Sequence, residues 1–493
     1  MRVTMIGAGY VGLVSGACFA DFGHQVVCVD KDAKKVEALN RGEIPIFEPG
    51  LDALVETNMQ QGRLEFSTDT ARVKDAEAVF IAVGTPSRRG DGHADLSYVY
   101  EAVREFAPIV SANAVVVTKS TVPVGTGDEI ERILRELRKD AEIQVVSNPE
   151  FLREGAAIQD FKHPDRIVVG TDDLAARDVL AEIYRPLYLN TPPLLYVSRR
   201  TAELIKYASN AFLATKITFI NEIADLCEAV GADVQEVSRG MGLDNRIGGK
   251  FLHAGPGFGG SCFPKDTSAL LKTAQDRGVA LRIVETVFAV NEQRKRAMAR
   301  KVMAALDGSV RGKTIAVLGL TFKPNTDDTR DSPAIPLITA LHDLGATVRG
   351  YDPAGMEQAK PFLPDVHYCN SAYSAAEGAD AIVIATEWEQ FRALDLARLK
   401  GVMARPVIVD LRNIYRPEEM TRAKFRYVAI GRAGVESGAG HRVRPRAAPP
   451  TGWRAIAALR RPAQLCRTGS PAPAARHGQA RLPPAPRFRR PRR

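Results

Sequence analysis

The chain has 493 residues, which is too long for one hydrophobic core and predicts two to four domains. The formal net charge of +9 would suggest a nucleic-acid-binding protein if the charge were spread evenly. Residues 433–493, however, hold 14 Arg, no Lys and one acidic residue, whereas residues 1–432 hold 53 basic and 57 acidic residues. The body of the protein is therefore mildly acidic, which argues against a nucleic-acid-binding surface.

The cysteines give no metal or disulfide pattern. None of the six stands in a C-x-x-C pair, which argues against zinc and against a secreted disulfide scaffold: Cys18, Cys28, Cys227, Cys262, Cys369 and Cys466. No stretch reaches the ~18 uninterrupted apolar residues of a membrane span. We therefore expect a cytoplasmic protein with no metal and no membrane segment.

The first thirty residues read as a dinucleotide-binding unit. A strand at 2–6 runs into the sequence GAGYVG at 7–12 and then into a helical pattern. Glycines in this turn allow close approach of a pyrophosphate, and the helix N-terminus offers free N–H groups. The residues predicted to contact the cofactor in this turn are Gly7, Gly9, Val11 and Gly12.

A second strand at 25–29 ends at Asp30. An acid at this place bonds the ribose hydroxyls and repels a 2′-phosphate, so Asp30 favours NAD over NADP. Lys35 is placed to neutralise the phosphate on the adenosine side, although a solvated helix lysine is an equally good interpretation.

Three further Val/Ile-rich runs, at 78–83, 114–117 and 143–146, predict buried strands of a parallel sheet. Ligands of such sheets lie outside the carboxyl ends of the strands. The loops that follow, at 84–86, 119–123 and 148–155, should therefore face cofactor and substrate. They contain Thr85, Thr121, Glu150 and Glu154.

Apolar residues recur at helical spacing from 201 to 230, and Gly231 is a suitable C-terminal cap. A helix of ~45 Å can connect two domains and supply a dimer surface. Lys206 and Asn210 lie four residues apart on one of its faces, able to meet one ligand or simply to face solvent.

A second α/β pattern has strands at 313–319, 347–352, 381–386 and 406–410. Its glycine fingerprint is replaced by GLTFKP at 319–324, which indicates a nucleotide domain that binds something other than NAD.

The most reactive feature is a cysteine on a glycine-rich loop, in the sequence FGGSCFPKD at 258–266. Polar, loop-like flanks suit a buried core cysteine poorly, and a nearby cation such as Lys265 would raise the thiolate fraction. We therefore expect Cys262 to be a nucleophile. Two nucleotide-type domains, a connecting helix and this thiol predict a dehydrogenase with a covalent step, acting on a nucleotide-linked substrate.

From Met1 to about Gly431 the chain resembles the UDP-glucose/GDP-mannose dehydrogenase family. The matching motifs lie at 7–12, 120–126, 148–155, 206–212, 257–266 and 319–323. The resemblance implies an α/β fold of two Rossmann-like, doubly wound parallel-sheet domains joined by a long central helix. The implied domains are an NAD-binding domain (1–198), a central helical and dimerisation domain (199–296), a UDP-sugar-binding domain (297–432) and a disordered Arg/Pro-rich tail (433–493).

The family's reaction is the oxidation of a sugar C6 alcohol to a carboxylate with two NAD⁺, here implied to convert UDP-glucose to UDP-glucuronate for polysaccharide biosynthesis. In it Cys262 would hold the aldehyde as a thiohemiacetal and then a thioester. By resemblance Lys206 and Asn210 stabilise the oxyanion, while Asp266, Glu150 and Thr121 orient water and move protons.

The resemblance also assigns binding residues. Those implied for the cofactor, besides the turn, are Asp30, Lys35, Thr85, Thr121, Glu154, Lys265 and Arg330. Those implied for the substrate are Glu150, Phe151, Leu152, Arg153, Glu154, Lys206, Asn210, Phe251, Leu252, His253, Ala254, Gly255, Gly259 and Lys323. Arg246 resembles an arginine that reaches the sugar of a neighbouring subunit, so a homodimer or a higher homo-oligomer is expected.

Three alternatives stay open. The substrate could be GDP-mannose or a UDP-N-acetyl-hexosamine. A cysteine hydrolase would use Cys262 with His163 or His253, and would leave two dinucleotide-like domains without a purpose. A catalytically dead NAD-binding regulator would not need the intact set of Cys262, Lys206 and Asp266.

The tail 433–493 holds 10 of the 30 prolines and is too poor in apolar residues to fold. Because it lacks lysine, we hypothesise that it comes from an out-of-frame reading of GC-rich coding sequence. The alternative is a genuine RNA- or membrane-adhesive tail, which would bind polyanions in a salt-dependent way.

Overall fold

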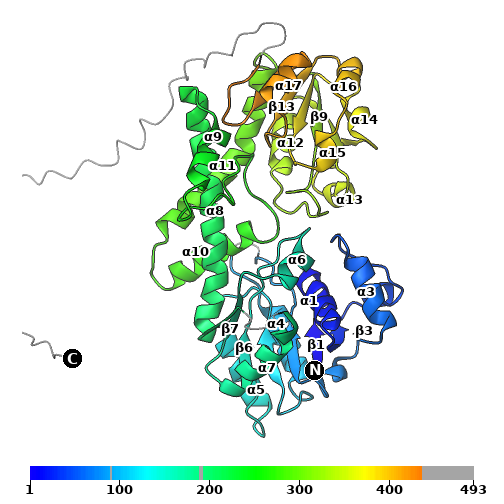
Figure 1. The fold of residues 1–493 in the computed structure, drawn as a ribbon, viewed down its shortest axis with the longest axis vertical. Helices are drawn as coiled ribbons and strands as arrows, with labels where there is room; N and C mark the ends of the chain where they lie inside the picture. The colour runs from blue at the N-terminus through cyan, green and yellow to red at the C-terminus, as the bar shows by residue number, and fades with distance from the viewer. Residues whose placement is uncertain (89–91, 188–192, 436–493) are drawn as a thin grey trace, which may run out of the picture. The chain divides into compact units, whose positions relative to one another are not determined.

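The computed structural model describes residues 1–88, 92–187 and 193–435 (Figure 1). All of the described residues belong to one compact unit, Met1–Pro445. The predicted tail lies outside the described residues except for 433–435. Val435 is paired with Tyr427 through two backbone hydrogen bonds of 2.8 Å, so regular structure continues slightly beyond the expected boundary at 432.

An eight-stranded sheet forms the N-terminal part. Its strands are β1 (Arg2–Ile6), β2 (Gln25–Val29), β3 (Leu64–Ser67), β4 (Ala78–Ile81), β5 (Val115–Thr118), β6 (Gln144–Ser147), β7 (Ile167–Gly170) and β8 (Leu194–Val197). They lie in the order β3-β2-β1-β4-β5-β6-β7-β8, and every pair is parallel except β6 with β7. Strands β1 to β3 are added toward one edge of the sheet and β4 to β8 toward the other, so the order of the strands switches between β1 and β4, which is where ligands of doubly wound folds bind.

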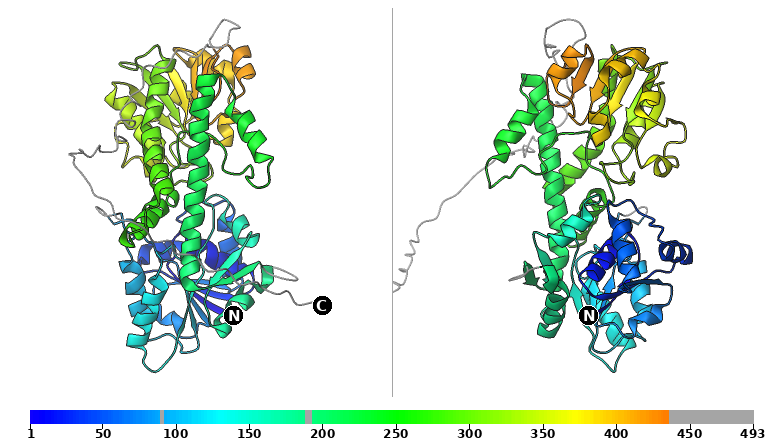
Figure 2. Two further views of the ribbon diagram at one scale, coloured as in Figure 1. Left: turned by 90° about the vertical axis from the view of Figure 1, so that its left-hand side faces the viewer. Right: turned by 45° about the vertical axis from the view of Figure 1, so that its right-hand side comes forward.

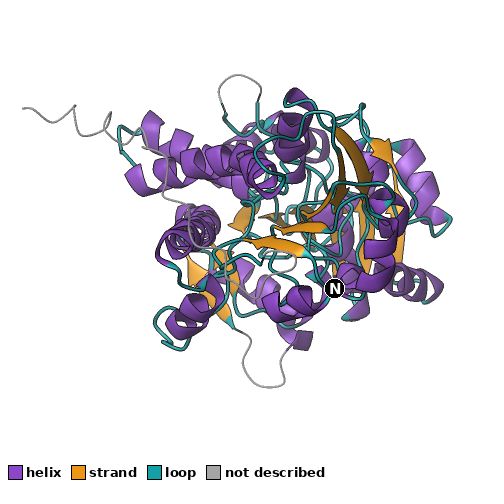
Figure 3. Ribbon diagram, turned by 90° about the horizontal axis from the view of Figure 1, so that it is seen from above, coloured by secondary structure: helices purple, strands orange, loops and turns teal. Residues whose placement is uncertain are grey.

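The eight-stranded sheet is flanked by helices, and the view from above shows helices on both sides of the strands (Figure 3). They are α1 (Tyr10–Asp21), α2 (Ala33–Asn40), α3 (Leu51–Gln60), α4 (Ser97–Phe106), α5 (Thr126–Leu137), α6 (Ala157–Lys162) and α7 (Leu174–Tyr184), with 3₁₀ turns at Thr70–Val73 and Arg185–Leu187. The strands read as continuous apolar runs because both faces are buried: neighbouring residues Phe80 and Ile81 of β4 belong to separate hydrophobic clusters.

The helix α8 (Arg199–Val230) links the two sheets (Figure 2). Ser198 caps its start by accepting a hydrogen bond from the N–H of Thr201, and Gly231 ends it with a left-handed backbone (φ 78°). It packs against β7 at one end and against α9 (Val234–Gly242), α10 (Phe263–Asp276) and α11 (Arg282–Ala305) along its length. The predicted connecting helix is therefore present, two residues longer at its start.

The second sheet has six parallel strands, in the order β11-β10-β9-β12-β13-β14. They are β9 (Thr314–Leu318), β10 (Thr347–Tyr351), β11 (His367–Tyr368), β12 (Ala381–Ile384), β13 (Val407–Asp410) and β14 (Arg426–Ala429). The flanking helices are α12 (Ala334–Asp343), α13 (Met356–Ala359), α14 (Ala372–Ala376), α15 (Glu389–Arg392), α16 (Leu396–Val402) and α17 (Pro417–Arg422).

The predicted fold class is confirmed: there are two doubly wound sheets with a long helix between them. In the ranges 1–88, 92–187 and 193–435, no helix has the length and apolar character needed to cross a bilayer.

Candidate active site

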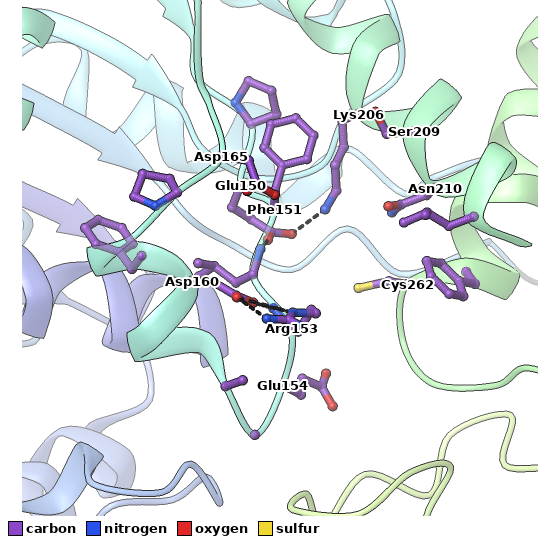
Figure 4. Close-up of a pocket in the computed structure, with 18 of the residues that line it drawn as sticks. Glu150, Phe151, Arg153, Glu154, Asp160, Asp165, Lys206, Ser209, Asn210 and Cys262 are labelled. Carbon is purple, nitrogen blue, oxygen red and sulfur yellow. Dashed lines mark hydrogen bonds and ion pairs between the residues drawn. The ribbon is translucent and has the colours of Figure 1, made fainter. Parts of the chain in front are cut away.

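A cavity of about 790 Å³ opens beside the carboxyl end of β6. Much of its wall comes from the loop after β6, the segment 160–167, the first half of α8, the loop before α10 and the segment 322–325. Figure 4 shows the side chains of Glu150, Lys206, Asn210 and Cys262 directed toward one space. The size suits a ligand as large as a nucleotide sugar.

Cys262 lies at the N-terminus of α10, in the wall of this cavity. Its Sγ is 3.6 Å from Oγ of Ser261. Burial raises the pKa of the Cys262 thiol to about 11, although Lys206 opposes this effect. The resting side chain is therefore a neutral thiol, and the expected increase in thiolate is absent.

Lys206 and Glu150 form an ion pair inside the protein. The Nζ of Lys206 donates to Oε1 of Glu150 at 2.9 Å, and the two side chains are 4% and 5% exposed. Burial lowers the pKa of Lys206, but Glu150, Cys262 and Asp266 raise it by more, so the lysine stays charged. Burial likewise raises the pKa of Glu150, and Lys206 brings it below its usual value.

Asn210 and Asp266 form a second buried pair next to the thiol. The Nδ2 of Asn210 donates to Oδ2 of Asp266 at 2.6 Å. The Nζ of Lys265 donates to the other oxygen of the same carboxylate at 2.7 Å. Lys265, the cation expected to act on Cys262, is thus engaged by Asp266. The cation that lowers the pKa of Cys262 is instead Lys206, 56 residues earlier in the chain. The helical spacing of Lys206 and Asn210 placed both correctly on one face.

Glu154 and Gly155 hold the loop after β6 against the second half of the protein. Glu154 accepts hydrogen bonds from the hydroxyls of Ser261 (3.0 Å) and Thr326 (3.2 Å). Burial and the nearby carboxylate of Asp328 raise the pKa of Glu154. Gly155 has a left-handed backbone (φ 77°), and a Cβ there would come within 2.4 Å of the carbonyl oxygen of Asn325. Only glycine fits this contact.

Lys119 is a residue of the cavity that the sequence did not single out. Its Nζ donates to Oδ1 of Asn148 (3.1 Å) and to the hydroxyl of Tyr184 (3.0 Å). Burial lowers its pKa to about 7. Lys119 begins the loop that carries Thr121, and its partner Asn148 begins the loop that carries Glu150. Its hydrogen bond therefore joins the loops after β5 and β6.

The predicted dinucleotide turn has the geometry that the glycines require. Gly7 has φ 102°, and a Cβ at Gly12 would lie 1.9 Å from the carbonyl oxygen of Gly7, so neither tolerates a side chain. A Cβ at Gly9 would meet nothing within 4 Å, which leaves open space where a pyrophosphate would approach.

Asp30 lies at the end of β2, beside this turn. One carboxylate oxygen accepts hydrogen bonds from the N–H of Ala8 (2.8 Å) and from Nζ of Lys35 (2.9 Å). Burial raises the pKa of Asp30, but the hydrogen bond from the N–H of Asp32 and the ion pair with Lys35 together lower it by more. The pKa of Asp30 is therefore below its usual value, and the side chain is an anion. These residues fit NAD.

The other predicted residues are spread over several surroundings. Six of the residues predicted to bind substrate line the cavity: Phe151, Leu152, Arg153, Phe251, Gly259 and Lys323. Four others do not: Leu252 and Ala254 lie in a hydrophobic core, His253 is exposed, and Gly255 donates its N–H to Asn221. Thr85 donates to the carbonyl of Thr121 (2.9 Å) at the dinucleotide edge, while Arg330 pairs with Asp328 (2.9 Å). Arg246 is 90% exposed and bonds only its neighbour Asp244 among the described residues.

The cavity also contains residues with no sequence signal. Arg166 lies over the ring of Phe151 (3.8 Å to the centroid), and Lys216 donates to the carbonyls of Ile247 and Gly248. His163, which the cysteine-hydrolase alternative named, also lines the cavity. Among the residues the structure describes, no group of three or more His, Cys, Asp and Glu side chains is placed to hold a metal ion.

Sequence comparison agrees with this arrangement along the chain. The NAD binding domain of the UDP-glucose/GDP-mannose dehydrogenase family matches residues 1–188, its central domain matches 200–293 and its UDP binding domain matches 316–417. The chain belongs to this family. NAD is therefore its cofactor.

Individual relatives match over nearly their whole length. The UDP-glucose 6-dehydrogenase of Rhizobium meliloti (strain 1021) is 67% identical over 435 residues, covering 88% of this chain and all of the relative. The UDP-glucose 6-dehydrogenase TuaD of Bacillus subtilis (strain 168) is 46% identical, covering 88% of this chain and 94% of the relative. A solved UDP-glucose dehydrogenase from Pyrobaculum islandicum superimposes with a TM-score of 0.80 at 39% identity, covering 88% and 98% of the two chains.

Proposed function

We propose that this protein oxidises UDP-glucose to UDP-glucuronate, with NAD as hydride acceptor and Cys262 as covalent catalyst. The observation that carries the proposal is the convergence of Cys262, the charged Lys206 and the amide of Asn210 on one cavity, in a chain that also forms a dinucleotide turn. The 67% identical relative named UDP-glucose 6-dehydrogenase supports the choice of sugar. The basic side chains of Arg153 and Lys323 in the wall suit a diphosphate.

The reaction divides into two oxidations and one hydrolysis. The nicotinamide ring, when bound, accepts the hydride that leaves C6 of the sugar in each oxidation. The first oxidation removes a hydride from C6 and a proton from the hydroxyl, leaving an aldehyde. Cys262 then adds to the aldehyde carbon: the S–C bond forms, and the thiol proton ends on the former carbonyl oxygen.

The second oxidation removes the remaining hydride from C6 and the hydroxyl proton, which leaves a thioester on Cys262. Water then attacks the thioester carbon, the C–S bond breaks, and carboxylate and free thiol are released. Lys206 and Asn210 stabilise the negative oxygen that forms at each addition, because both are buried donors fixed by Glu150 and Asp266. Glu150 and Asp266 are the carboxylates that accept protons. Thr121, in the loop after β5, helps them to orient the water.

We also propose that the active form is a homodimer built on α8. Five large apolar side chains of this helix are exposed in the single chain, by 45–67%: Leu204, Phe212, Phe219, Leu226 and Val230. Covering them with a second copy would bury this apolar stripe, and the exposed Arg246 is accessible to a neighbouring subunit. Phe219→Glu should give monomers in light scattering, whereas Leu174→Glu, on exposed α7, should not. A wild type that runs as a monomer would contradict the dimer.

The proposed domain boundaries are 1–198, 199–296 and 297–432, and the proposed location is the cytoplasm. The substrate is tested by following NADH formation with UDP-glucose, GDP-mannose and UDP-N-acetylmannosamine side by side at equal concentration. We expect two NADH for each UDP-glucose consumed, and UDP-glucuronate as the product. Preference for another sugar nucleotide would refute the substrate, and one NADH per sugar would refute the four-electron reaction.

A further inference from the structure

Glu48 is a buried carboxylate outside the proposed catalytic set. It lies in the connection between α2 and α3 and is 7% exposed. Its Oε1 accepts a hydrogen bond from the N–H of Ala157 (2.7 Å), and its Oε2 accepts one from the N–H of Gly155 (2.6 Å). The hydroxyl of Tyr10 also donates to Oε2. A buried carboxyl group needs hydrogen-bond partners in place of water, and these three donors supply them.

The three donors come from two different ligand sites. Tyr10 is the first residue of α1 and part of the glycine turn that fits NAD. Gly155 and Ala157 end the loop that carries Glu150 and Glu154 into the cavity. The helices α1 and α6 also pack against each other (Figure 1). Glu48 is therefore a direct bridge between the cofactor turn and the substrate loop.

The loop has little freedom to move independently of this bridge. On its other side, Gly155 packs against Asn325 so closely that no Cβ fits, and Glu154 bonds Ser261 and Thr326. A shift of Gly155 therefore moves Glu154 and its contacts beside Cys262. Burial and the carboxylate of Glu48 raise the pKa of the Tyr10 hydroxyl, so this group keeps its proton and remains a donor.

We propose that Glu48 is a positioning residue that couples the two sites, so that NAD on the turn and UDP-sugar on the loop each favour binding of the other. The inference rests on the proposed function for the identity of the sugar nucleotide. NAD would hold the turn in its binding geometry, and the sugar nucleotide would do the same for the loop. Because Glu48 joins the two, ordering one of them lowers the free-energy cost of ordering the other. Coupling of this kind is reciprocal: NADH must tighten UDP-glucose binding by the same factor as UDP-glucose tightens NADH binding.

The test measures binding and needs no turnover. NADH with UDP-glucose is an unreactive pair, because the alcohol offers no carbon that can accept a hydride. Calorimetry gives the Kd of UDP-glucose with and without saturating NADH, for the wild type, Tyr10→Phe and Glu48→Gln. We expect a ratio of about 5-fold or more in the wild type. Tyr10→Phe keeps the ring and removes only the donor, and its ratio should fall to about 1.

Matched controls are Tyr98→Phe and Glu142→Gln, both at exposed positions, which should keep the wild-type ratio. If the bridge had a purely structural role, the variants would bind UDP-glucose more weakly both with and without NADH. The ratio of the two Kd values would then equal that of the wild type, and this outcome would overturn the inference. So would a wild-type ratio of 1. If Glu48→Gln fails to fold, Tyr10→Phe alone decides. If the wild type binds NADH but not UDP-glucose, the proposed substrate is wrong, which is a different result from binding without coupling.

Discussion

The buried pair of Lys206 and Glu150 permits a test that separates stability from catalysis. Both side chains are almost fully enclosed, and their contact is 2.9 Å. Removing one partner of such a pair leaves an uncompensated charge and costs about 3–5 kcal/mol of unfolding free energy. Glu150→Gln and Lys206→Met are nearly isosteric changes. We expect each to lower the free energy of unfolding by about 3 kcal/mol, because Lys119 still faces Glu150 and Asp266 still faces Lys206.

The double variant should behave differently in the two assays. With both charges gone there is no buried ion to compensate, so urea unfolding followed by circular dichroism should show a loss well below the sum of the two single losses. NADH formation should stay at least about 100-fold below wild type in the two variants that lack Lys206, because the charge that stabilises the oxyanion is missing there.

An exposed pair provides the control. Arg72 and Glu65 have side chains that are 40% and 52% exposed, so Arg72→Met with Glu65→Gln should cost less than about 1 kcal/mol and leave activity unchanged. Additive losses in the buried double variant would refute the ion-pair argument. Recovery of activity in that variant would refute the role of Lys206 as oxyanion donor.

Three further predictions concern other parts of the chain. Cys262→Ser should lose sugar-acid formation while retaining some first-step NADH, because serine is the poorer nucleophile; native turnover, measured with Cys227→Ser as control, would make the thiol structural. Asp30→Ala should raise the KM for NAD by about 10-fold or more and relax discrimination against NADP, and an unchanged NAD/NADP ratio would remove Asp30 from the cofactor site. Lys119→Met tests the pKa of about 7, which burial lowers from the ordinary value. Lysine binds its proton more tightly in the unfolded chain, so the free energy of unfolding of the wild type should rise by about 2 kcal/mol relative to that of the variant between pH 7 and 9. A difference in unfolding free energy that does not change with pH would contradict this.

Local sequence patterns were enough for the architecture. Runs such as Val115–Thr118 are buried on both faces, and parallel strands of this kind can be recognised from composition alone. The strands β3, β7, β8, β11 and β14 were not predicted: β3 alternates in burial, β8 is partly exposed and β11 has only two residues. Such short strands are fixed by pairing with a neighbour.

The site was predicted to the extent that its residues stand in recognisable motifs. Lys206 and Asn210 were placed by helical spacing, and the Asp30 turn by its glycines. The pairing of Asn210 with Asp266, and of Glu48 with Gly155, depends on how distant segments pack, for which the sequence has no local signal. Lys119 looked like an ordinary loop lysine because its partners, Asn148 and Tyr184, stand 29 and 65 residues further along the chain.

The neutral resting state of Cys262 is compatible with its proposed role. Addition of a thiol to an aldehyde leaves the thiol proton on the new hydroxyl, so the step neither consumes nor releases a proton overall. An ionised thiol is therefore not required before the aldehyde exists. Because oxidants attack the thiolate, a pKa of about 11 also protects the sulfur while it waits. The charge of Lys206 acts on the sulfur and its Nζ bonds Glu150, so proton transfer from sulfur to oxygen can take place beside a fixed ammonium group.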